Sequence, residues 1–192
     1  NYLDSLGHEV LLVDKITYAA NVDNVHAANN TILAVEKDIC DITEEDLGDY
    51  EYLVNFAAES HVDNSIKDGR PFVRSNVEGT FNLLELARKN SNLKKFIQIS
   101  TDEVYGNMDD YDKTVLANES FPLVGSSYYS STKASADLLV QAAGRTYGLP
   151  YLITRTCNNF GVNQNKEKFI PTIFNCINND IEIPIYGDGN QI

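Results

Sequence analysis

The sequence predicts an α/β protein with a doubly wound parallel sheet, on three observations. Short apolar runs typical of buried strands recur along the chain, segments with helical spacing separate them, and polar residues follow the strand ends. Buried strands that alternate with helices form parallel sheets with helices on both faces. Ligands of such sheets bind at the carboxyl ends of the strands.

Five segments are predicted to form strands, because they are rich in aliphatic and β-branched residues and end in polar ones. They cover residues 9–13, 31–35, 52–58, 95–100 and 151–154. The first ends at Asp14, and the second leads on to Asp38.

Helices are expected at 72–89, 128–147 and 168–178, and residues 1–6 resemble a helix end with Gly7 as its stop. In the first of these, Val73, Val77, Phe81 and Leu84 have helical spacing and predict an amphipathic face. The segment 106–127 is a long loop, which in a compact domain is usually functional or disordered.

Composition excludes several classes of protein. The net charge of −13 disfavours nucleic-acid and membrane-surface partners, and no apolar run has membrane-spanning length. Cys40, Cys157 and Cys176 are far apart and lack metal-ligand spacing, so we expect no metal and three reduced thiols in a cytoplasmic protein.

The composition changes after Arg155, where an Asn-rich stretch begins. We expect the sheet domain to cover residues 1–155, and residues 156–192 to begin a smaller substrate-binding region.

Thr101, Asp102 and Glu103 directly follow the strand at 95–100. By themselves they are more typical of a polar turn than of a catalytic acid and base. Their place at the carboxyl end of a predicted parallel strand favours the catalytic interpretation.

Tyr129 and Lys133 are four residues apart on a predicted helix and therefore share one face. An ammonium beside a phenol favours the phenolate, so we expect Lys133 to lower the pKa of Tyr129 and make it a useful base. The alternative is an ordinary pair of helix residues.

Asp14 closes a hydrophobic strand, as does the acid that holds the ribose hydroxyls of NAD in dinucleotide folds. That acid normally follows a glycine-rich loop by about twenty residues. Only thirteen residues precede Asp14, and Gly7 is the one glycine among them. Either Asp14 is merely a strand-end acid, or the first strand and a GxxGxxG-type loop lie upstream of this chain; we expect the latter.

The motifs together resemble the extended short-chain dehydrogenases, and among them the dTDP-glucose 4,6-dehydratases. The resemblance covers nearly the whole chain, and the segments at 57–66 and 99–106 are its most specific parts. The matching segments are "DKITYAAN", "DICD", "AAESHVDNSI", "NVEGTFNLLE", "ISTDEVYG", "YSSTKASAD" and "NNFG". Relative to that family the chain lacks the glycine loop and the C-terminal part, and it has Phe160 where Tyr is common.

The resemblance implies a Rossmann-like fold, tightly bound NAD and a three-step dehydration. Tyr129 takes the proton of the sugar 4-OH as hydride leaves C4, with Thr101 on O4. Glu103 then removes the C5 proton, Asp102 protonates the departing 6-OH, and hydride returns to C6. The two carboxyl groups must therefore differ in protonation.

The resemblance also assigns binding residues. For NAD these are Asp14, Lys15, Thr17, Asp38, Ile39, Ala57, Ala58, Ser75, Tyr129 and Lys133. For the nucleotide sugar they are Ser60, Thr101, Asn159, Lys168, Phe169 and Tyr186, with His61 lining the site and taking no part in proton transfer. Ala57 and Ala58 could equally be core residues, and Lys168 could lie in a solvated loop.

Three alternatives stay open: a UDP-hexose 4,6-dehydratase, a 4-epimerase, and a non-catalytic NAD-binding protein of the same fold. The acid pair argues against the epimerase, because epimerase relatives usually lack it. The resemblance further implies a homodimer through the helices at 72–89 and 128–147.

Overall fold

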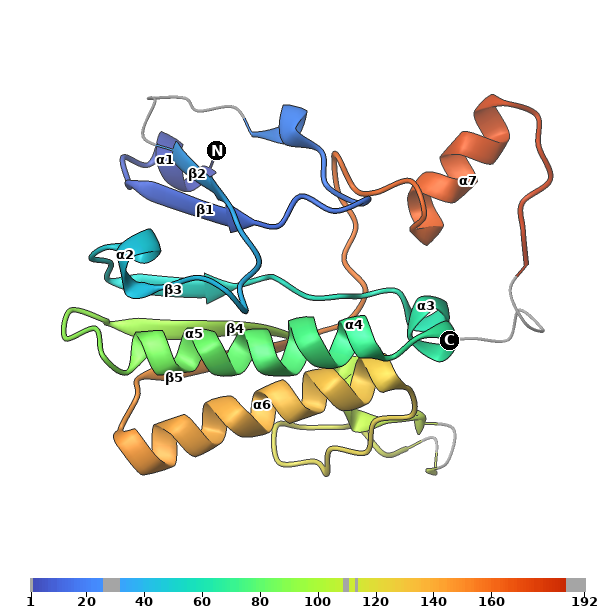
Figure 1. Cartoon of the computed structure of the whole chain (residues 1–192). Helices are drawn as coiled ribbons and strands as arrows, with labels where there is room; N and C mark the ends of the chain where they lie inside the picture. The colour runs from blue at the N-terminus through green and yellow to red at the C-terminus, as the bar shows by residue number, and fades with distance from the viewer. Residues whose placement is uncertain (1, 26–31, 109–110, 113, 186–192) are drawn as a thin grey trace.

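The computed structural model describes residues 2–25, 32–108, 111–112 and 114–185. Its strands form two parallel sheets (Figure 1). In the first, β1 (Val10–Asp14) pairs with β2 (Ile32–Glu36). In the second, the order is β3 (Tyr52–Asn55), β4 (Lys95–Thr101) and β5 (Tyr151–Thr156). The parallel α/β fold is confirmed, although the third strand stops at Asn55 rather than at residue 58.

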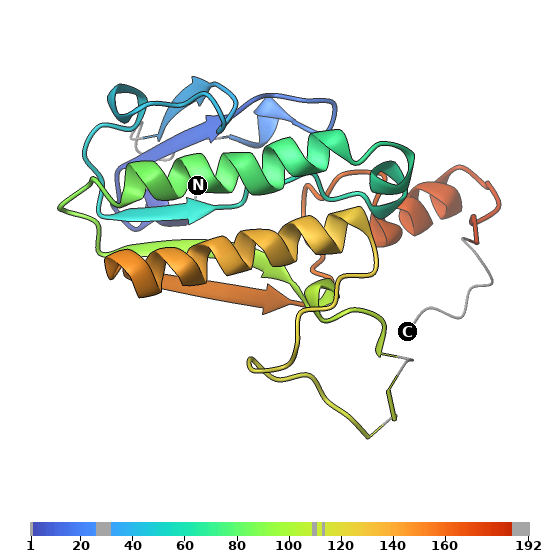
Figure 2. The ribbon, with the colours of Figure 1, turned by 60° about the horizontal axis from the view of Figure 1, so that its bottom comes forward.

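The strands of the two sheets point the same way, so their carboxyl ends lie at one side of the molecule (Figure 2). Thr101 pairs with Thr156 at that side, and Asn55 pairs with Gln98. In the described structure β1 and β3 belong to separate sheets and are not paired. The residues that follow the strand ends are therefore brought together from distant parts of the sequence.

Helix α6 (Tyr128–Tyr147) has the predicted bounds. Ser127 and Ser130 cap its first turn reciprocally, each side chain accepting a hydrogen bond from the other residue's backbone N–H. Gly148 ends the helix in the left-handed conformation, with φ of 69°. Both signals are local in sequence, which is why the bounds were predictable.

The helix predicted at 72–89 is not a single α-helix. It consists of α4 (Arg70–Phe72), a π-helical segment η2 (Val73–Gly79) and α5 (Thr80–Ala87). The predicted apolar face is half right: Leu84 is buried and Val77 is half-buried, but Val73 and Phe81 are 45% and 53% exposed. The wider π turns change which residues share a face, so a 3.6-residue period misassigns them.

The buried face of this helix instead carries Ser75, Asn76 and Gly79 before Leu83 and Leu84. Gly79 is needed for close packing: a Cβ there would lie 2.4 Å from Cδ1 of Ile39. The side chain of Ile39 thus belongs to the hydrophobic core.

The remaining helices are short. The end of a helix at the start of the chain is confirmed as α1 (Tyr2–Ser5), with Gly7 at φ of 86°, and α7 (Phe169–Asn178) matches the helix expected at 168–178. Within the described residues, four elements had no prediction: η1 (Val22–Asn24), α2 (Glu44–Leu47), α3 (Val62–Lys67) and η3 (Asp102–Tyr105).

The hydrophobic core lies between the three-stranded sheet and helices α5 and α6, which lie side by side on one face of it (Figure 2). Phe96 and Val140 are its fully buried centre. A smaller cluster around Val104 and Tyr105 packs against part of the 106–127 loop.

No helix among the described residues is long and apolar enough to cross a membrane. Cys40, Cys157 and Cys176 are all free thiols.

Candidate active site

The acid pair begins a 3₁₀ helix at the end of β4. Thr101, the last residue of that strand, caps η3: its hydroxyl accepts a hydrogen bond from Glu103 N at 3.3 Å and donates one to Asp102 Oδ1 at 3.1 Å. Thr101 is 8% exposed, and both acids are half-buried. The strand end therefore holds the hydroxyl and the two carboxyl groups in a fixed arrangement.

Tyr129 and Lys133 lie on the first turns of α6, and both side chains are buried. Burial raises the pKa of Tyr129, the charges of Glu103 and Asp102 raise it further, and a hydrogen bond with the Thr101 side chain lowers it. Tyr129 is thus close to all three residues at the end of β4. The structure brings the tyrosine to the end of β4 that carries the acid pair, and a joint catalytic role of these residues stays a prediction.

The expectation that Lys133 lowers the pKa of Tyr129 is wrong for this structure, in which the pKa of Tyr129 is raised. The Lys133 ammonium donates to the carbonyl oxygen of Ile99 at 2.5 Å. Burial also lowers the pKa of Lys133 itself to about 8, while the charge of Asp137 opposes that shift. The spacing of Tyr129 and Lys133 correctly predicted that they share a face of the helix. It could not predict that the Lys133 ammonium binds the carbonyl oxygen of Ile99 on β4.

Glu103 differs from an exposed carboxylate. Burial raises its pKa, the neighbouring charge of Asp102 raises it further, and the charge of Lys168 lowers it. A raised pKa makes the ionised Glu103 carboxylate a stronger base. The influence of Lys168 also places the residue that precedes α7 near the acid pair.

Two further residues close this part of the site. Lys168 Nζ lies 3.4 Å from the hydroxyl of Ser60, in the loop after β3. The Cys157 thiol forms a hydrogen bond with Asp102, whose carboxylate raises the pKa of that thiol. Lys168 and Ser60 were both predicted to bind the substrate, whereas Cys157 had no predicted role in the site, because only the fold brings it to Asp102.

The remaining residues predicted to bind the substrate are Asn159, Phe169 and Tyr186, and His61 was predicted to line the site. The side-chain amide of Asn159 donates to Thr156 Oγ1 at 3.0 Å and to the carbonyl oxygen of Cys157 at 3.1 Å. Phe169 is 71% exposed, and Tyr186 lies outside the described residues. His61 precedes α3, and its buried Nδ1 has no hydrogen-bond partner among the described residues.

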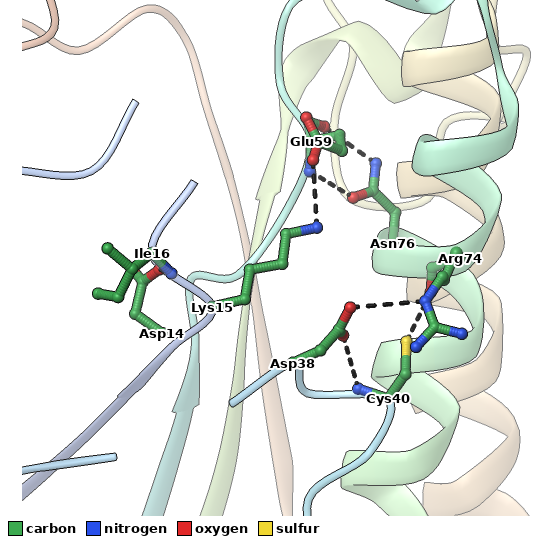
Figure 3. A network of polar contacts seen from close by, with 8 residues as sticks. All are labelled: Asp14, Lys15, Ile16, Asp38, Cys40, Glu59, Arg74 and Asn76. Atoms are coloured by element: carbon green, nitrogen blue, oxygen red, sulfur yellow. Dashed lines mark hydrogen bonds and ion pairs between the residues drawn. The ribbon is translucent and has the colours of Figure 1, made fainter. Parts of the chain in front are cut away.

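On the cofactor side, Asp14 and Lys15 lie at the end of β1 (Figure 3). Asp14 Oδ1 accepts a hydrogen bond from Ile16 N at 2.8 Å, and Lys15 Nζ lies 3.2 Å from Glu59 Oε1. The Lys15–Glu59 ion pair thus links the end of the two-stranded sheet to the loop after β3. Thr17 is exposed beyond it.

Asp38 follows β2 and is held by two groups (Figure 3). Its carboxylate accepts a hydrogen bond from Cys40 N at 2.9 Å and lies 3.5 Å from Arg74 Nε. Burial opposes the charged form, but the hydrogen bonds with Cys40 and the charges of Lys15 and Arg74 lower the pKa of Asp38 overall. Asp38 is therefore an anion at neutral pH.

The loop that carries Ala57 and Ala58 is fixed by Asn76, which lies in the π segment and is 1% exposed. Asn76 Oδ1 accepts from Glu59 N at 2.8 Å, and its Nδ2 donates to Glu59 O at 3.1 Å and to Thr132 Oγ1 at 3.0 Å. One side chain thereby joins this loop to α6. Arg74, Asn76 and Glu59 had no predicted role, because their partners are distant in sequence.

These residues fit a dinucleotide. Asp14 and Asp38 present carboxylate acceptors suited to ribose hydroxyls and to an adenine amine, and the small Ala57 and Ala58 leave the backbone accessible. The predicted Ser75 is buried at 3% exposure in the same π segment as Asn76. Ile39 could contribute only through its backbone, because its side chain is in the core.

Comparisons with known proteins agree with this geometry. The family model of the "NAD dependent epimerase/dehydratase family" matches residues 1–192. The chain is 44% identical to the low-salt glycan biosynthesis protein Agl12 of Haloferax volcanii, over 99% of this chain and 61% of that protein. It is 43% identical to a dTDP-glucose 4,6-dehydratase of Neisseria meningitidis serogroup B, over 95% of this chain and 55% of that enzyme.

Among solved structures, the fold is similar to DesIV, a dTDP-glucose 4,6-dehydratase from Streptomyces venezuelae crystallised with NAD and TYD. The TM-score is 0.88 at 40% identity, over 98% of this chain and 58% of DesIV. The chain thus spans less than two thirds of each of these proteins. The match over its full length shows that the chain belongs to the NAD dependent epimerase/dehydratase family.

Proposed function

We propose that the protein is an NAD-dependent 4,6-dehydratase that converts dTDP-glucose to its 4-keto-6-deoxy derivative. The observation that carries this proposal is the meeting of Thr101, Asp102 and Glu103 with Tyr129 at the carboxyl end of β4. An epimerase needs one acid–base group at C4, whereas loss of water across C5–C6 needs a further acid and base. The relatives named above support this choice.

When bound, NAD supplies the acceptor of hydride from C4 and the donor to C6. Tyr129 takes the proton of the 4-OH, and the hydroxyl of Thr101 contacts O4. Lys133, one turn further along α6, binds the carbonyl oxygen of Ile99 on β4 and so ties the helix of Tyr129 to the strand that ends at Thr101. NAD itself is held by Asp14, Lys15, Thr17, Asp38, Ile39, Ala57, Ala58 and Ser75, besides Tyr129 and Lys133.

Glu103 and Asp102 divide the dehydration between them. The raised pKa of Glu103 makes its carboxylate the stronger base for the C5 proton. Asp102, whose carboxyl group contacts the Cys157 thiol on one side and the Thr101 hydroxyl on the other, acts in its protonated form and gives its proton to the departing 6-OH. The proton that Glu103 takes from C5 stays on Glu103 and returns to C5 when hydride reaches C6. The nucleotide sugar is bound by Ser60 and Thr101 and by four residues of the region that begins at residue 156: Asn159, Lys168, Phe169 and Tyr186.

The test is the double substitution Asp102→Asn with Glu103→Gln. Each acid–base contact contributes about 10²–10⁴ in rate, so 4,6-dehydration should fall below detection while NAD binding is retained. The assay is the alkaline chromophore of the 4-keto-6-deoxy product, with dTDP-, UDP- and CDP-glucose offered in parallel. Unchanged turnover of the double variant would refute the roles, and preference for UDP-glucose would favour the UDP-hexose dehydratase.

We also propose that two copies pair through the α4–α5 helix and α6. The exposed apolar residues Val73, Phe81 and Leu138, at 45%, 53% and 55% exposure, lie on these adjacent helices. Phe81→Asp should produce a monomer in sedimentation equilibrium, and an unchanged mass would contradict the proposed interface. The three free thiols support a cytoplasmic location.

A further inference from the structure

Arg155 on β5 makes a buried set of contacts that the proposed chemistry does not use. Its Nε lies 2.8 Å from Asp137 Oδ2, and its Nη1 donates to the hydroxyl of Tyr105 at 3.0 Å and to the carbonyl oxygen of Glu119 at 3.2 Å. The guanidinium also lies 5.2 Å from the centre of the Tyr105 ring. The side chain of Arg155 is 11% exposed and that of Asp137 is 0% exposed.

Two partners of Arg155, Asp137 and Tyr105, belong to elements of the candidate active site. Asp137 is on α6, four residues after Lys133 and eight after Tyr129, so the three share a face of that helix. Tyr105 is the last residue of η3, the 3₁₀ helix that begins with Asp102. One guanidinium therefore joins the helix of the tyrosine and lysine to the helix of the two acids.

Stability alone is a weak reason for such a group. Burying an ion pair costs much of the attraction it gains, and apolar replacements are often equally stable. The chain also has a comparable arginine at its surface: Arg88 pairs with Glu85 at 2.6 Å and lies 5.0 Å from the Tyr147 ring. Arg88 contacts α6 only at Tyr147, at the opposite end of that helix from Tyr129, so it serves as a matched control.

We propose that Arg155, Asp137 and Tyr105 form a positioning unit that holds the acid pair of η3 against the Tyr129–Lys133 face of α6. The inference rests on the proposed function for its effect on turnover. Asp137 has a second effect, because its charge favours the protonated form of the buried Lys133. The other charged groups around this face are Arg155 on β5, and Asp102 and Glu103 on η3.

The first test compares Arg155→Lys, Asp137→Asn and Tyr105→Phe with the control Arg88→Lys. Misplacement of reacting groups by about 1 Å can cost about 10²-fold, so we expect a loss of kcat of that order for the first two. Tyr105→Phe removes one hydrogen bond only and should lose less, and Arg88→Lys should keep wild-type kcat. KM should change much less than kcat, since the unit does not contact the substrate. Arg155→Lys combined with Asp137→Asn should cost little more than either alone, as residues that act as a unit are not additive.

Unfolding in urea, measured on the same proteins, separates positioning from folding. If the folded fraction of each variant turns over at the wild-type rate, the unit is structural only and the proposal fails. Tyr105→Phe and Arg155→Lys are conservative enough to keep this comparison available.

The second test does not depend on turnover. In the protein labelled with ¹³C at lysine Cε, Lys133→Arg identifies the Lys133 resonance, and its pH titration gives the pKa. Asp137→Asn should move that pKa below the value of about 8, and the high-pH limb of kcat should move the same way. If the pKa of Lys133 is the same in Asp137→Asn as in the wild type, the charge of Asp137 does not favour protonated Lys133, and this part of the proposal fails. If the wild type makes no 4-keto sugar, the proposed function fails, and the titration still decides the role of Asp137.

Discussion

The two sheets of this molecule are built differently although both serve one site. In the three-stranded sheet, Phe96 is fully buried and Gln98 is 1% exposed beneath α5 and α6. In the two-stranded sheet, no residue of β1 or β2 is buried, and Leu33 is 68% exposed. The proposed catalytic residues follow or pack against the three-stranded sheet, whereas Asp14 and Thr17 extend from the two-stranded one.

This difference separates two tasks. Lys133, Asp137 and Arg155 are fixed by burial and by contacts between elements, as groups that must be placed accurately require. The cofactor residues at the end of β1 are joined to the packed sheet through the ion pair of Lys15 with Glu59 (Figure 3). We therefore expect substitutions in the packed half to affect rate and stability strongly, and those in the open half to affect them weakly.

The largest effect is expected from Tyr129→Phe, which removes the hydroxyl next to Thr101 and the two acids. Turnover should fall by about 10²–10⁴-fold while the fold is kept. The control is Tyr147→Phe, at the exposed end of the same helix. Equal activities of the two variants would remove Tyr129 from the chemistry.

The contrast in packing is tested by Phe96→Ala against Leu33→Ala. Phe96 fills the core, so its truncation should lower the free energy of unfolding by about 3 to 5 kcal/mol. Leu33 is largely exposed, and its truncation should change that energy by less than about 0.5 kcal/mol. Urea unfolding gives both numbers, and similar losses would show that the open sheet is as tightly packed as the other.

Lys133 should leave a signature in the pH dependence of stability. Its pKa in the folded protein is about 8, below the ordinary 10.5, so the folded state binds fewer protons between these values. The free energy of unfolding contributed by this group therefore rises as the pH increases from about 8 to about 10.5, by about 3 kcal/mol. Lys133→Met should remove that rise. A wild-type minus variant difference that is flat over this range would contradict the buried ammonium.

The smallest effect is expected for the ion pair of Lys15 with Glu59, which links the two-stranded sheet to the loop after β3. Lys15→Met breaks a partly exposed ion pair, so it should lower the free energy of unfolding by less than about 1 kcal/mol. If Lys15→Met lowered the free energy of unfolding by more than about 2 kcal/mol, the stabilities of the two sheets would be strongly coupled, although in the described part of the chain no hydrogen bonds pair their strands.

Local signals in the sequence predicted much of this structure. Ser127 and Gly148 mark the ends of α6, and the polar residues after β4 and β1 gave the candidate catalytic and cofactor groups. What could not be predicted depends on contacts between distant residues. The π segment at Val73–Gly79 changed the buried face of its helix, and the acceptor of Lys133 is a carbonyl on β4.

The Arg155 contacts illustrate the same limit. Its partners lie at positions 105, 119 and 137, and no spacing in the sequence relates them. Likewise, Cys157 was predicted only as a reduced thiol, and the fold places it against Asp102.

The most direct test of the central claim follows hydrogen through the reaction. dTDP-glucose carrying deuterium at C4 is incubated with the protein, and the product is examined by NMR. If Tyr129 and the acid pair act on one hexose, the deuterium will be found at C6 of a 4-keto-6-deoxy sugar. Deuterium retained at C4 of an epimerised or unchanged sugar would contradict 4,6-dehydration.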